Sequence, residues 1–300
     1  MRTIRGWLVA LTGLWLAGCQ ALFFRVVDSG GEASVPISRT YDSGHGLALD
    51  VYRPPHPDGP TPVVLFFYGG SWRNGDRGQY AFVGRALAAR GVLAVIADYR
   101  RYPQGVFPRF EEDAAAAARW TFDHAAEFGG DARRVFVAGH SAGAHIAALL
   151  ASDSHYLAAK GLAPRDFAGA IGIAGPYDFL PLTDPKLIEV FGAPDAWPAS
   201  QPVRFIDGDE PPFLLLQGAA DRIVDPRNAG AMADALRRQD AAVEQRYYPG
   251  VGHFRILAGL RFPSLAPTLD DVLAFVRAIP PVDAHAREVA RGAASGHARK

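Results

Sequence analysis

The sequence contains a single cysteine among 300 residues and carries no net charge, because 31 Lys and Arg residues balance 31 Asp and Glu residues. One cysteine cannot form an intramolecular disulfide, and it excludes a zinc site built from several cysteines. The nine histidines show no His-Glu-x-x-His spacing, so we expect no metal site. A chain without net charge is not attracted as a whole to phosphate groups, and we expect no nucleic-acid partner.

Signatures of disorder and of fibrous proteins are also missing. Hydrophobic residues make up 49% of the chain and charged residues 21%, with 32 glycines, 23 prolines and no internal repeat. This composition excludes a disordered tail protein, a collagen and a coiled coil. A chain of 300 residues can bury a substantial core, either in two average domains or in one large α/β domain.

The amino terminus has the composition of a signal peptide. Arg2 and Arg5 precede an apolar run from Trp7 to Ala17, which is too short to span the hydrocarbon of a bilayer. The run ends in Leu16-Ala17-Gly18-Cys19, which resembles the lipobox of bacterial lipoproteins. The resemblance implies removal of residues 1–18 and acylation of Cys19, which would anchor the mature chain to a membrane.

Gln20 stands where an Asp favours retention in the inner membrane of such lipoproteins, so the resemblance implies an outer-membrane anchor facing the periplasm. The alternative is an uncleaved membrane anchor, because residues 21–24 prolong the apolar stretch to about 18 residues. Both interpretations place the rest of the chain outside the cytoplasm. We expect a lipidated cysteine and flexible tether over residues 19–40, one folded domain over 41–280, and a frayed tail over 281–300.

Short apolar runs alternate with helical patterns through the predicted domain. This alternation predicts an α/β fold with a mostly parallel central sheet and helices on both faces. Expected strands are Leu47–Tyr52, Pro62–Tyr68, Val92–Asp98, Arg134–Ala138, Ala168–Ala174, Phe213–Gln217 and Val243–Tyr248. Expected helices are Gln79–Arg90, Arg109–Phe128, Ala142–Ala151, Arg227–Gln239 and Thr268–Ala278. Ligands of such sheets bind where the carboxyl ends of the strands turn into loops.

The sequence Gly139-His140-Ser141-Ala142-Gly143 matches the pattern G-x-S-x-G. The pattern alone is weak, but here a β-branched run precedes it and a strongly helical run follows it. Glycines at these positions permit a sharp turn from strand to helix that exposes the serine hydroxyl. Ser141 is therefore the candidate nucleophile.

A serine hydroxyl needs an imidazole to accept its proton and a carboxylate to orient that imidazole. Asp221 follows an apolar strand downstream of Ser141, and His253 follows 32 residues later in a glycine-containing loop. Asp225 is a nearby competitor for the role of the acid, and Asp221 is the preferred residue. An oxyanion that forms at the substrate needs N–H donors, which we expect from Ala142 and from a loop at residues 68–72.

Together these pieces resemble the α/β-hydrolases of the esterase/lipase group, near the hormone-sensitive-lipase-like, kynurenine-formamidase-like and isoprenylcysteine-methylesterase-like enzymes. The resemblance covers residues 41–280. The matching motifs are Tyr68-Gly69-Gly70-Ser71-Trp72, Asn74-Gly75-Asp76, Ala97-Asp98-Tyr99-Arg100, Gly139-His140-Ser141-Ala142-Gly143-Ala144-His145, Gly175-Pro176-Tyr177-Asp178, Asp221-Arg222-Ile223-Val224 and Gly252-His253. Tyr68 departs from the family pattern, in which a histidine at this position helps to hold the loop.

The resemblance implies that Ser141 is the nucleophile, Asp221 the orienting acid and His253 the base. It also implies that the N–H groups of Gly70, Ser71 and Ala142 form the oxyanion hole. The expected activity is hydrolysis of small or medium acyl esters through an acyl-enzyme, with no metal or organic cofactor.

Two other functions remain open from the residues. An amide or formamide hydrolase could use the same triad, and a non-catalytic envelope binding protein could have the same fold. The irregular, aromatic-containing stretch from Gly175 to Pro212 is expected to wall the acyl or alcohol pocket. The absence of a long lid domain from the pattern favours small or medium soluble substrates.

Overall fold

The structure is a computed structural model that describes residues 23–28 and 35–283. The predicted signal peptide, Cys19 and the tail beyond residue 283 lie outside the described residues. Among the helices that the structure describes, none is long and apolar enough to cross a membrane.

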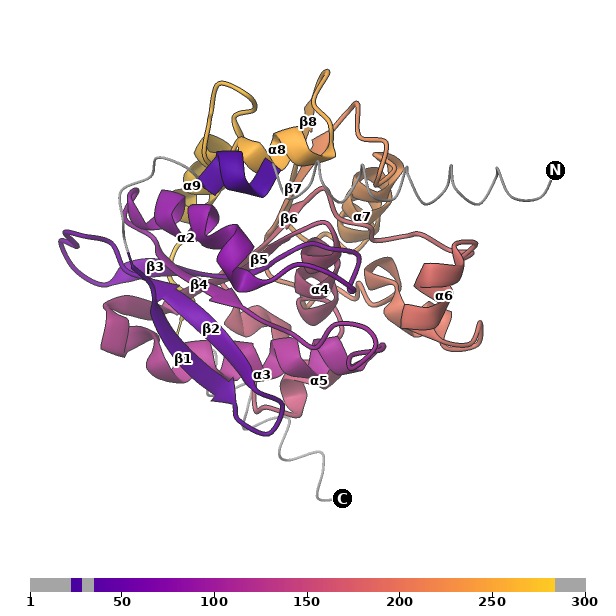
Figure 1. Ribbon diagram of the computed structural model, residues 1–300, viewed down its shortest axis with the longest axis horizontal. Coiled ribbons are helices and arrows are strands. Elements are labelled where there is room, and N and C mark those ends of the chain that lie inside the picture. The colour runs from indigo at the N-terminus through magenta and orange to yellow at the C-terminus, as the bar shows by residue number, and fades with distance from the viewer. Residues whose placement is uncertain (1–22, 29–34, 284–300) are drawn as a thin grey trace.

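One eight-stranded sheet with the order β1-β2-β4-β3-β5-β6-β7-β8 forms the centre of the described chain (Figure 1). β1 pairs antiparallel with β2 and β2 antiparallel with β4, whereas the other neighbours are parallel. The predicted mostly parallel α/β architecture is therefore confirmed. The strands are β1 Ile37–Asp42, β2 Leu47–Tyr52, β3 Thr61–Phe67, β4 Leu93–Ala97, β5 Gly130–His140, β6 Gly169–Ile173, β7 Phe213–Gly218 and β8 Val243–Tyr248.

Helices cover both faces of this sheet, with α2 and α9 on one side and α3 and α4 on the other (Figure 1). The helices are α2 Ala81–Ala88, α3 Arg109–His124, α4 Ala142–Leu150, α5 Ser154–Ala158, α6 Pro185–Phe191, α7 Arg227–Arg238, α8 His253–Ala258 and α9 Thr268–Ala278. Short 3₁₀ turns extend α2 at its start, over Arg77–Tyr80, and α3 at its end, over Ala125–Phe128.

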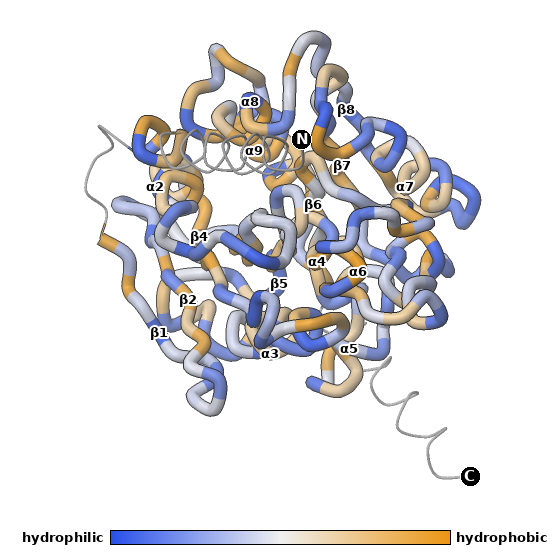
Figure 2. Tube along the Cα trace, turned by 45° about the vertical axis from the view of Figure 1, so that its right-hand side comes forward, coloured by the Kyte–Doolittle hydropathy of each residue, from blue (hydrophilic) through white to orange (hydrophobic). Residues whose placement is uncertain are grey.

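The interior strands are hydrophobic on both faces because helices cover both. Every residue of β4, β6 and β7 is buried, as expected for doubly covered parallel strands. β8 lies at the edge of the sheet and alternates between exposed and partly buried residues over most of its length. Figure 2 shows hydrophilic stretches beside the edge strand β8 and in the outer turns near α7.

The folded region extends further towards the amino terminus than the sequence predicts. β1 begins at Ile37, inside the expected tether of residues 19–40. Residues 23–28 form a helical turn, drawn in indigo beside α2 and α8 in Figure 1, and Phe24 and Val27 in it are buried. This part of the predicted tether is docked on the domain because its apolar side chains pack against the domain's aromatic residues.

The parallel strands bring the candidate residues to one edge of the sheet. β3 is followed by the loop at residues 68–72, β5 by Ser141, β7 by the Asp221 loop and β8 by the His253 loop. Since β3, β5, β6, β7 and β8 run parallel as neighbours, their carboxyl ends meet at the same edge. Four segments from distant parts of the sequence thus converge on one site.

Candidate active site

Ser141 lies in a sharp turn between β5 and α4. Its φ of 55° and ψ of −121° lie outside the regions that L-residues prefer. The flanking glycines make the turn possible, since a Cβ on Gly139 would lie 2.1 Å from the Gly143 carbonyl oxygen and one on Gly143 would lie 2.0 Å from the Phe67 carbonyl oxygen. The predicted strand–turn–helix context of the motif is present in the structure.

Asp221 and His253 are joined by a buried hydrogen bond of 2.8 Å between Oδ2 and Nδ1. The other carboxylate oxygen of Asp221 accepts hydrogen bonds from the N–H groups of Ile223 at 2.8 Å and Val224 at 3.0 Å. Burial alone would raise the pKa of Asp221, but the hydrogen bond and charge of His253 together with the two N–H donors outweigh burial and lower that pKa. An ionised Asp221 therefore fixes the His253 ring with Nδ1 protonated and Nε2 free to accept a proton.

Ser141 and His253 line the same cavity, and Ser141 is 8% exposed. The Ser141 hydroxyl makes no hydrogen bond to another described side chain. Catalytic hydrogen bonds are often long before substrate binds. The placement of Ser141 and His253 in one cavity is therefore the evidence that the two side chains can act together.

Asp225, the competing candidate for the acid, is held elsewhere. Its carboxylate pairs with Arg227 at 2.6 Å, where the two side chains are 46% and 90% exposed. Asp225 also accepts a hydrogen bond from the Arg227 backbone N–H at 2.9 Å. The structure thus places Asp221, and not Asp225, against the His253 ring.

The Tyr68 ring stacks on the Tyr99 ring, with 4.6 Å between the centroids, and its hydroxyl donates no hydrogen bond to the loop at residues 68–72. Instead the N–H of Gly69 donates to the Tyr80 hydroxyl oxygen at 3.0 Å. The same oxygen lies 3.0 Å from His140 Nδ1, and His140 Nε2 lies 3.3 Å from the His253 carbonyl oxygen. A neutral His140 that donates from Nε2 and accepts at Nδ1 satisfies every one of these contacts.

Burial is the main reason that the pKa of His140 lies well below its ordinary value, and the nearby His253 lowers it further. His140 therefore stays neutral in the folded protein near pH 7. No motif in the sequence points to Tyr80, and His140 stands out only as part of the G-x-S-x-G motif. Together they link the 68–72 loop to the backbone of His253.

The predicted oxyanion-hole residues surround Ser141. Gly70 and Ser71 line one cavity with Ser141, and Ser71 and Ala142 line a larger cavity that Ser141 also lines. No described residue accepts a hydrogen bond from the N–H of Gly70 or Ser71. Ser71 and Trp72 have φ values of 54° and 57°, so the loop turns sharply at the edge of the cavity.

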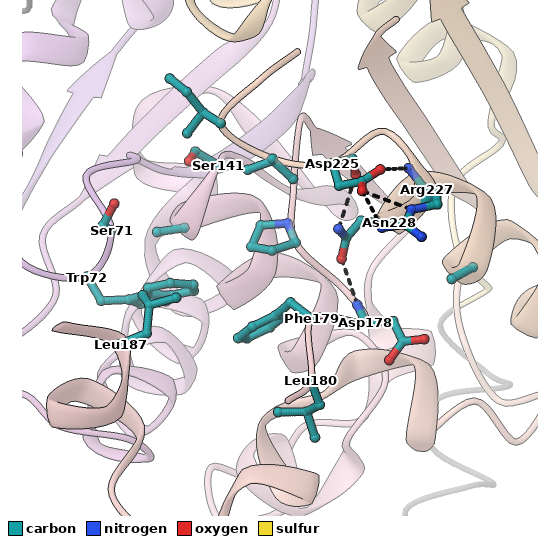
Figure 3. Close-up of a pocket in the computed structure, with 15 residues that line it drawn as sticks. Ser71, Trp72, Ser141, Asp178, Phe179, Leu180, Leu187, Asp225, Arg227 and Asn228 are labelled. Carbon is teal, nitrogen blue, oxygen red and sulfur yellow. Dashed lines mark hydrogen bonds and ion pairs between the residues drawn. The ribbon is translucent and has the colours of Figure 1, made fainter. Parts of the chain in front are cut away.

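The larger cavity, of about 580 Å³, extends from Ser141 along the segment that follows β6 (Figure 3). Trp72, Phe179 and Leu187 give it an apolar wall, while Asp225 and Arg227 lie at the opposite side in Figure 3. The residues of the stretch between Gly175 and Pro212 that line it are Pro176, Asp178, Phe179, Leu180 and Leu187.

A buried polar pair lies behind the Trp72 wall. Glu111 of α3 and His145 of α4 are both fully buried, with 3.6 Å between Glu111 Oε1 and His145 Nδ1. Neither carboxyl oxygen of Glu111 has a hydrogen-bond partner among the described residues, whereas His145 Nε2 lies 2.7 Å from the Ser200 carbonyl oxygen. Burial, with a smaller contribution from Asp153 and Asp113, raises the pKa of Glu111 well above its usual value, and burial lowers the pKa of His145 to about 4.

The described residues contain no cluster of three or more His, Cys, Asp or Glu side chains that could hold a metal ion. The site consists instead of a hydroxyl, a carboxylate–imidazole pair and backbone N–H groups.

A protein-family model described as BD-FAE matches residues 49–236, which is well over half of the chain. The chain belongs to the BD-FAE family. The family match begins in β2 and ends in α7, so it includes Ser141 and Asp221 and stops before His253.

Curated relatives of this BD-FAE protein are named as esterases. The esterase LipC of Mycobacterium tuberculosis is 30% identical over 261 residues, covering 80% of this chain and 64% of LipC. A probable isoprenylcysteine alpha-carbonyl methylesterase of Arabidopsis thaliana is 28% identical over 228 residues, covering 68% of this chain and 48% of that protein. The chain therefore spans about half to two thirds of the length of these relatives.

Solved structures share the fold. Pyrobaculum calidifontis esterase superposes on this chain with a TM-score of 0.71 at 22% sequence identity. The superposition covers 86% of this chain and 90% of the esterase chain. Thermogutta terrifontis esterase 2, phosphonylated by sarin, has a TM-score of 0.71 at 24% identity over 84% of this chain and 99% of its own. The predicted α/β-hydrolase fold of the esterase group is confirmed.

Proposed function

We propose that the protein is a serine carboxylic-ester hydrolase with Ser141 as nucleophile, His253 as base and Asp221 as orienting acid. The observation that carries the proposal is the buried 2.8 Å hydrogen bond from His253 to Asp221, with His253 in the same cavity as the strained Ser141 turn. The esterase names of LipC and of the plant methylesterase support the same reaction class.

In the proposed reaction, Ser141 Oγ attacks the ester carbonyl carbon while His253 Nε2 takes the hydroxyl proton. The N–H groups of Gly70, Ser71 and Ala142 stabilise the negative oxygen, and each such donor is worth about 3 kcal/mol of barrier. The C–O bond to the alcohol then breaks, and the leaving oxygen takes the proton from Nε2. Water hydrolyses the acyl-enzyme by the same steps, and Asp221 stays ionised throughout.

Small and medium acyl groups are the proposed substrates. The larger cavity holds about 580 Å³, which is enough for an acyl group of moderate size but bounded by the segment after β6. Thermogutta terrifontis esterase 2 has been solved with propionate and with butyrate bound, which supports short acyl groups. An assay across nitrophenyl ester chain lengths should therefore peak below palmitate.

Replacement of the nucleophile tests the mechanism. Ser141→Ala should lower kcat by about 10⁴-fold or more while the protein remains folded. Because Thermogutta terrifontis esterase 2 is phosphonylated by sarin, a fluorophosphonate probe should label the wild type and leave the variant unlabelled. A wild type that resists the probe and hydrolyses no ester would instead be a non-catalytic binding protein.

The same triad would cleave amides, so the leaving group must be tested directly. Comparison of kcat/KM for phenyl acetate and N-formylkynurenine separates an esterase from a formamide hydrolase. We expect phenyl acetate to be the better substrate.

We also propose that Cys19 is lipidated and anchors the protein to the outer membrane, facing the periplasm. Support comes from the sequence alone: the basic residues, the short apolar run and a single cysteine at the end of a lipobox-like sequence. Mass spectrometry of the mature amino terminus should find an acylated Cys19 as the first residue. An unmodified Met1, or a Cys19 without lipid, contradicts the proposal.

A further inference from the structure

Two cavities meet at Ser141. The larger one, of about 580 Å³, runs along Phe179 and Leu187, and a second one of about 530 Å³ lies between the 68–72 loop and the start of α8. Ser71, Ser141 and Ile223 line both cavities. An ester bound at Ser141 can therefore place its acyl part in one cavity and its alcohol part in the other.

The position of His253 decides which part enters which cavity. Of the two cavities, His253 lines only the second. When the tetrahedral adduct collapses, the electron pair of the breaking C–O bond goes to the alcohol oxygen, which must take a proton from His253 Nε2. Such a transfer requires hydrogen-bond contact between the two atoms. The alcohol therefore leaves through the second cavity, and the acyl group occupies the larger one.

The second cavity has aromatic walls and no carboxylate, lysine or arginine among its lining residues. It is lined by Phe23, Gly70, Ser71, Asn74, Tyr80, His140, Ser141, Ile223, His253 and Phe254. The larger cavity, in contrast, has Asp178, Asp225 and Arg227 in its lining. An uncharged, apolar alcohol would contact the rings of the second cavity without leaving a buried charge unpaired.

Phe23 comes from the helical turn at residues 23–28, which is fixed in place on three sides. The Phe23 ring lies 5.3 Å from the Phe254 ring, and the Phe24 ring lies 5.3 Å from the Tyr80 ring, measured between centroids. Asp28 at the end of the turn forms an ion pair with Arg85 of α2. These contacts make Phe23 a fixed wall of the cavity.

We propose that the second cavity is the alcohol subsite, that it selects esters of uncharged apolar alcohols, and that Phe23 is a residue that determines this specificity. The inference rests on the proposed esterase function. The 23–28 segment thus shapes the substrate range of a site whose reacting groups all come from the strand ends of the sheet.

Two ester series test the proposal with purified protein that begins at Cys19 or earlier. The alcohol series varies the alcohol and consists of methyl acetate, butyl acetate and hexyl acetate. The acyl series varies the acid and consists of methyl acetate, methyl butanoate and methyl hexanoate. In Phe23→Ala, the ratio of kcat/KM for hexyl acetate to that for methyl acetate should fall about tenfold, because the alkyl chain loses its aromatic wall. The ratio of methyl hexanoate to methyl acetate should keep its wild-type value.

Leu187→Ala is the matched variant for the larger cavity, and it should change the acyl ratio rather than the alcohol ratio. Phe23→Leu, which keeps part of the wall, should lie between Phe23→Ala and the wild type in the alcohol ratio. Thermal unfolding midpoints confirm that each variant is folded.

The outcomes separate this inference from the proposed function. Hydrolysis that depends on Ser141, combined with an alcohol ratio that Phe23→Ala does not change, overturns the inference alone. A change of the acyl ratio in Phe23→Ala reverses the assignment of the two cavities and also overturns it. If the wild type hydrolyses no ester of either series, the proposed function fails and the inference with it.

Discussion

The hydroxyl oxygen of Tyr80 lies 3.0 Å from Nδ1 of His140, and it also accepts a hydrogen bond from the N–H of Gly69 at 3.0 Å. His140 Nε2 in turn lies 3.3 Å from the carbonyl oxygen of His253. One phenol and one neutral imidazole therefore connect the loop that carries the proposed oxyanion donors with the proposed base. Tyr68 makes no hydrogen bond to Tyr80 or His140, and its ring contacts the Tyr80 ring with 6.0 Å between the centroids.

Tyr80→Phe should lower kcat more than it raises KM. The substitution keeps the ring that walls the second cavity but leaves the Gly69 N–H and His140 Nδ1 without a partner, which costs about 1–3 kcal/mol for a buried group. If half of that cost is lost as transition-state stabilisation because the oxyanion donors are displaced, kcat falls by about two- to tenfold. Steady-state kinetics on phenyl acetate measure the split between kcat and KM.

A purely structural role for Tyr80 gives a different result. Tyr80→Phe would then lower the thermal unfolding midpoint without a matching fall in kcat of the protein that remains folded. Tyr41→Phe is a suitable control, because the Tyr41 hydroxyl donates to the Asp98 carbonyl oxygen at 2.6 Å, outside the 68–72 loop.

Asp221→Asn should lower kcat by about 10⁴-fold, because an amide neither fixes the protonated Nδ1 of His253 nor stabilises the imidazolium that forms in the transition state. The neighbouring Asp225→Asn removes an exposed ion pair with Arg227 and should cost far less. Parallel measurement of kcat for both variants checks the assignment. Equal losses in the two variants would show that Asp221 is not the specific partner of His253.

Much of the fold can be predicted from local patterns. β8 and α9 begin and end at the residues that the apolar periodicity indicates, and β2 does so too. β1 could not be predicted because its sequence is Ile-Ser-Arg-Thr-Tyr-Asp and three of its six residues are exposed, so it lacks the apolar alternation of a half-buried strand. α8 was missed because a helix of six residues depends on tertiary packing rather than on its own propensity.

In the candidate site too, local sequence patterns predict some residues, whereas others depend on tertiary contacts. Ser141, Asp221 and His253 could be predicted because each follows a recognisable strand, and parallel strands end at one edge. The contact of Tyr80 with His140 spans 60 residues and depends on how β3 and β5 are aligned, with Phe67 opposite Gly139. The role of Phe23 was hidden in an apolar stretch that continues the amino-terminal run, and only its packing against Phe254 distinguishes it.

Stability should depend on pH through Glu111. Its pKa in the folded protein is raised by burial, so the folded state keeps a proton that the unfolded state releases above its ordinary value of 4.5. The free energy of unfolding therefore loses about 1.4 kcal/mol per pH unit from this group as pH rises from the unfolded towards the folded pKa. Glu111→Gln removes this loss. The free energy of unfolding of the variant should therefore rise relative to that of the wild type as pH rises.

Urea unfolding at pH 5, 7 and 9 measures the difference. Glu112→Gln is the matched control, because the Glu112 side chain is 56% exposed. The buried carboxyl of Glu111 remains in that variant. If Glu111→Gln and the wild type respond equally to pH, the pKa of Glu111 is not raised in the folded protein and the prediction is wrong.

Replacement by alanine should change the stability of the protein in opposite directions at two glycines that lie in helices, Gly143 and Gly230. A Cβ on Gly143 in α4 would lie 2.0 Å from the Phe67 carbonyl oxygen and 2.6 Å from the Tyr68 carbonyl oxygen, so α4 must move away from the sheet. Gly143→Ala should therefore destabilise the protein by at least about 3 kcal/mol and lower kcat, because α4 carries the Ala142 N–H.

Gly230 in α7 provides the contrast, because a Cβ there meets only the Tyr247 hydroxyl oxygen at an ordinary 3.4 Å. Gly230→Ala should stabilise the protein by about 0.5–1 kcal/mol, since alanine loses less backbone entropy in a helix than glycine does. Urea unfolding midpoints of the two variants test both the predicted loss of stability in Gly143→Ala and the predicted gain in Gly230→Ala. A Gly143→Ala variant as stable as the wild type would mean that α4 does not approach β3 as closely as the structure shows, and the Ser141 turn would then need no glycine beside it.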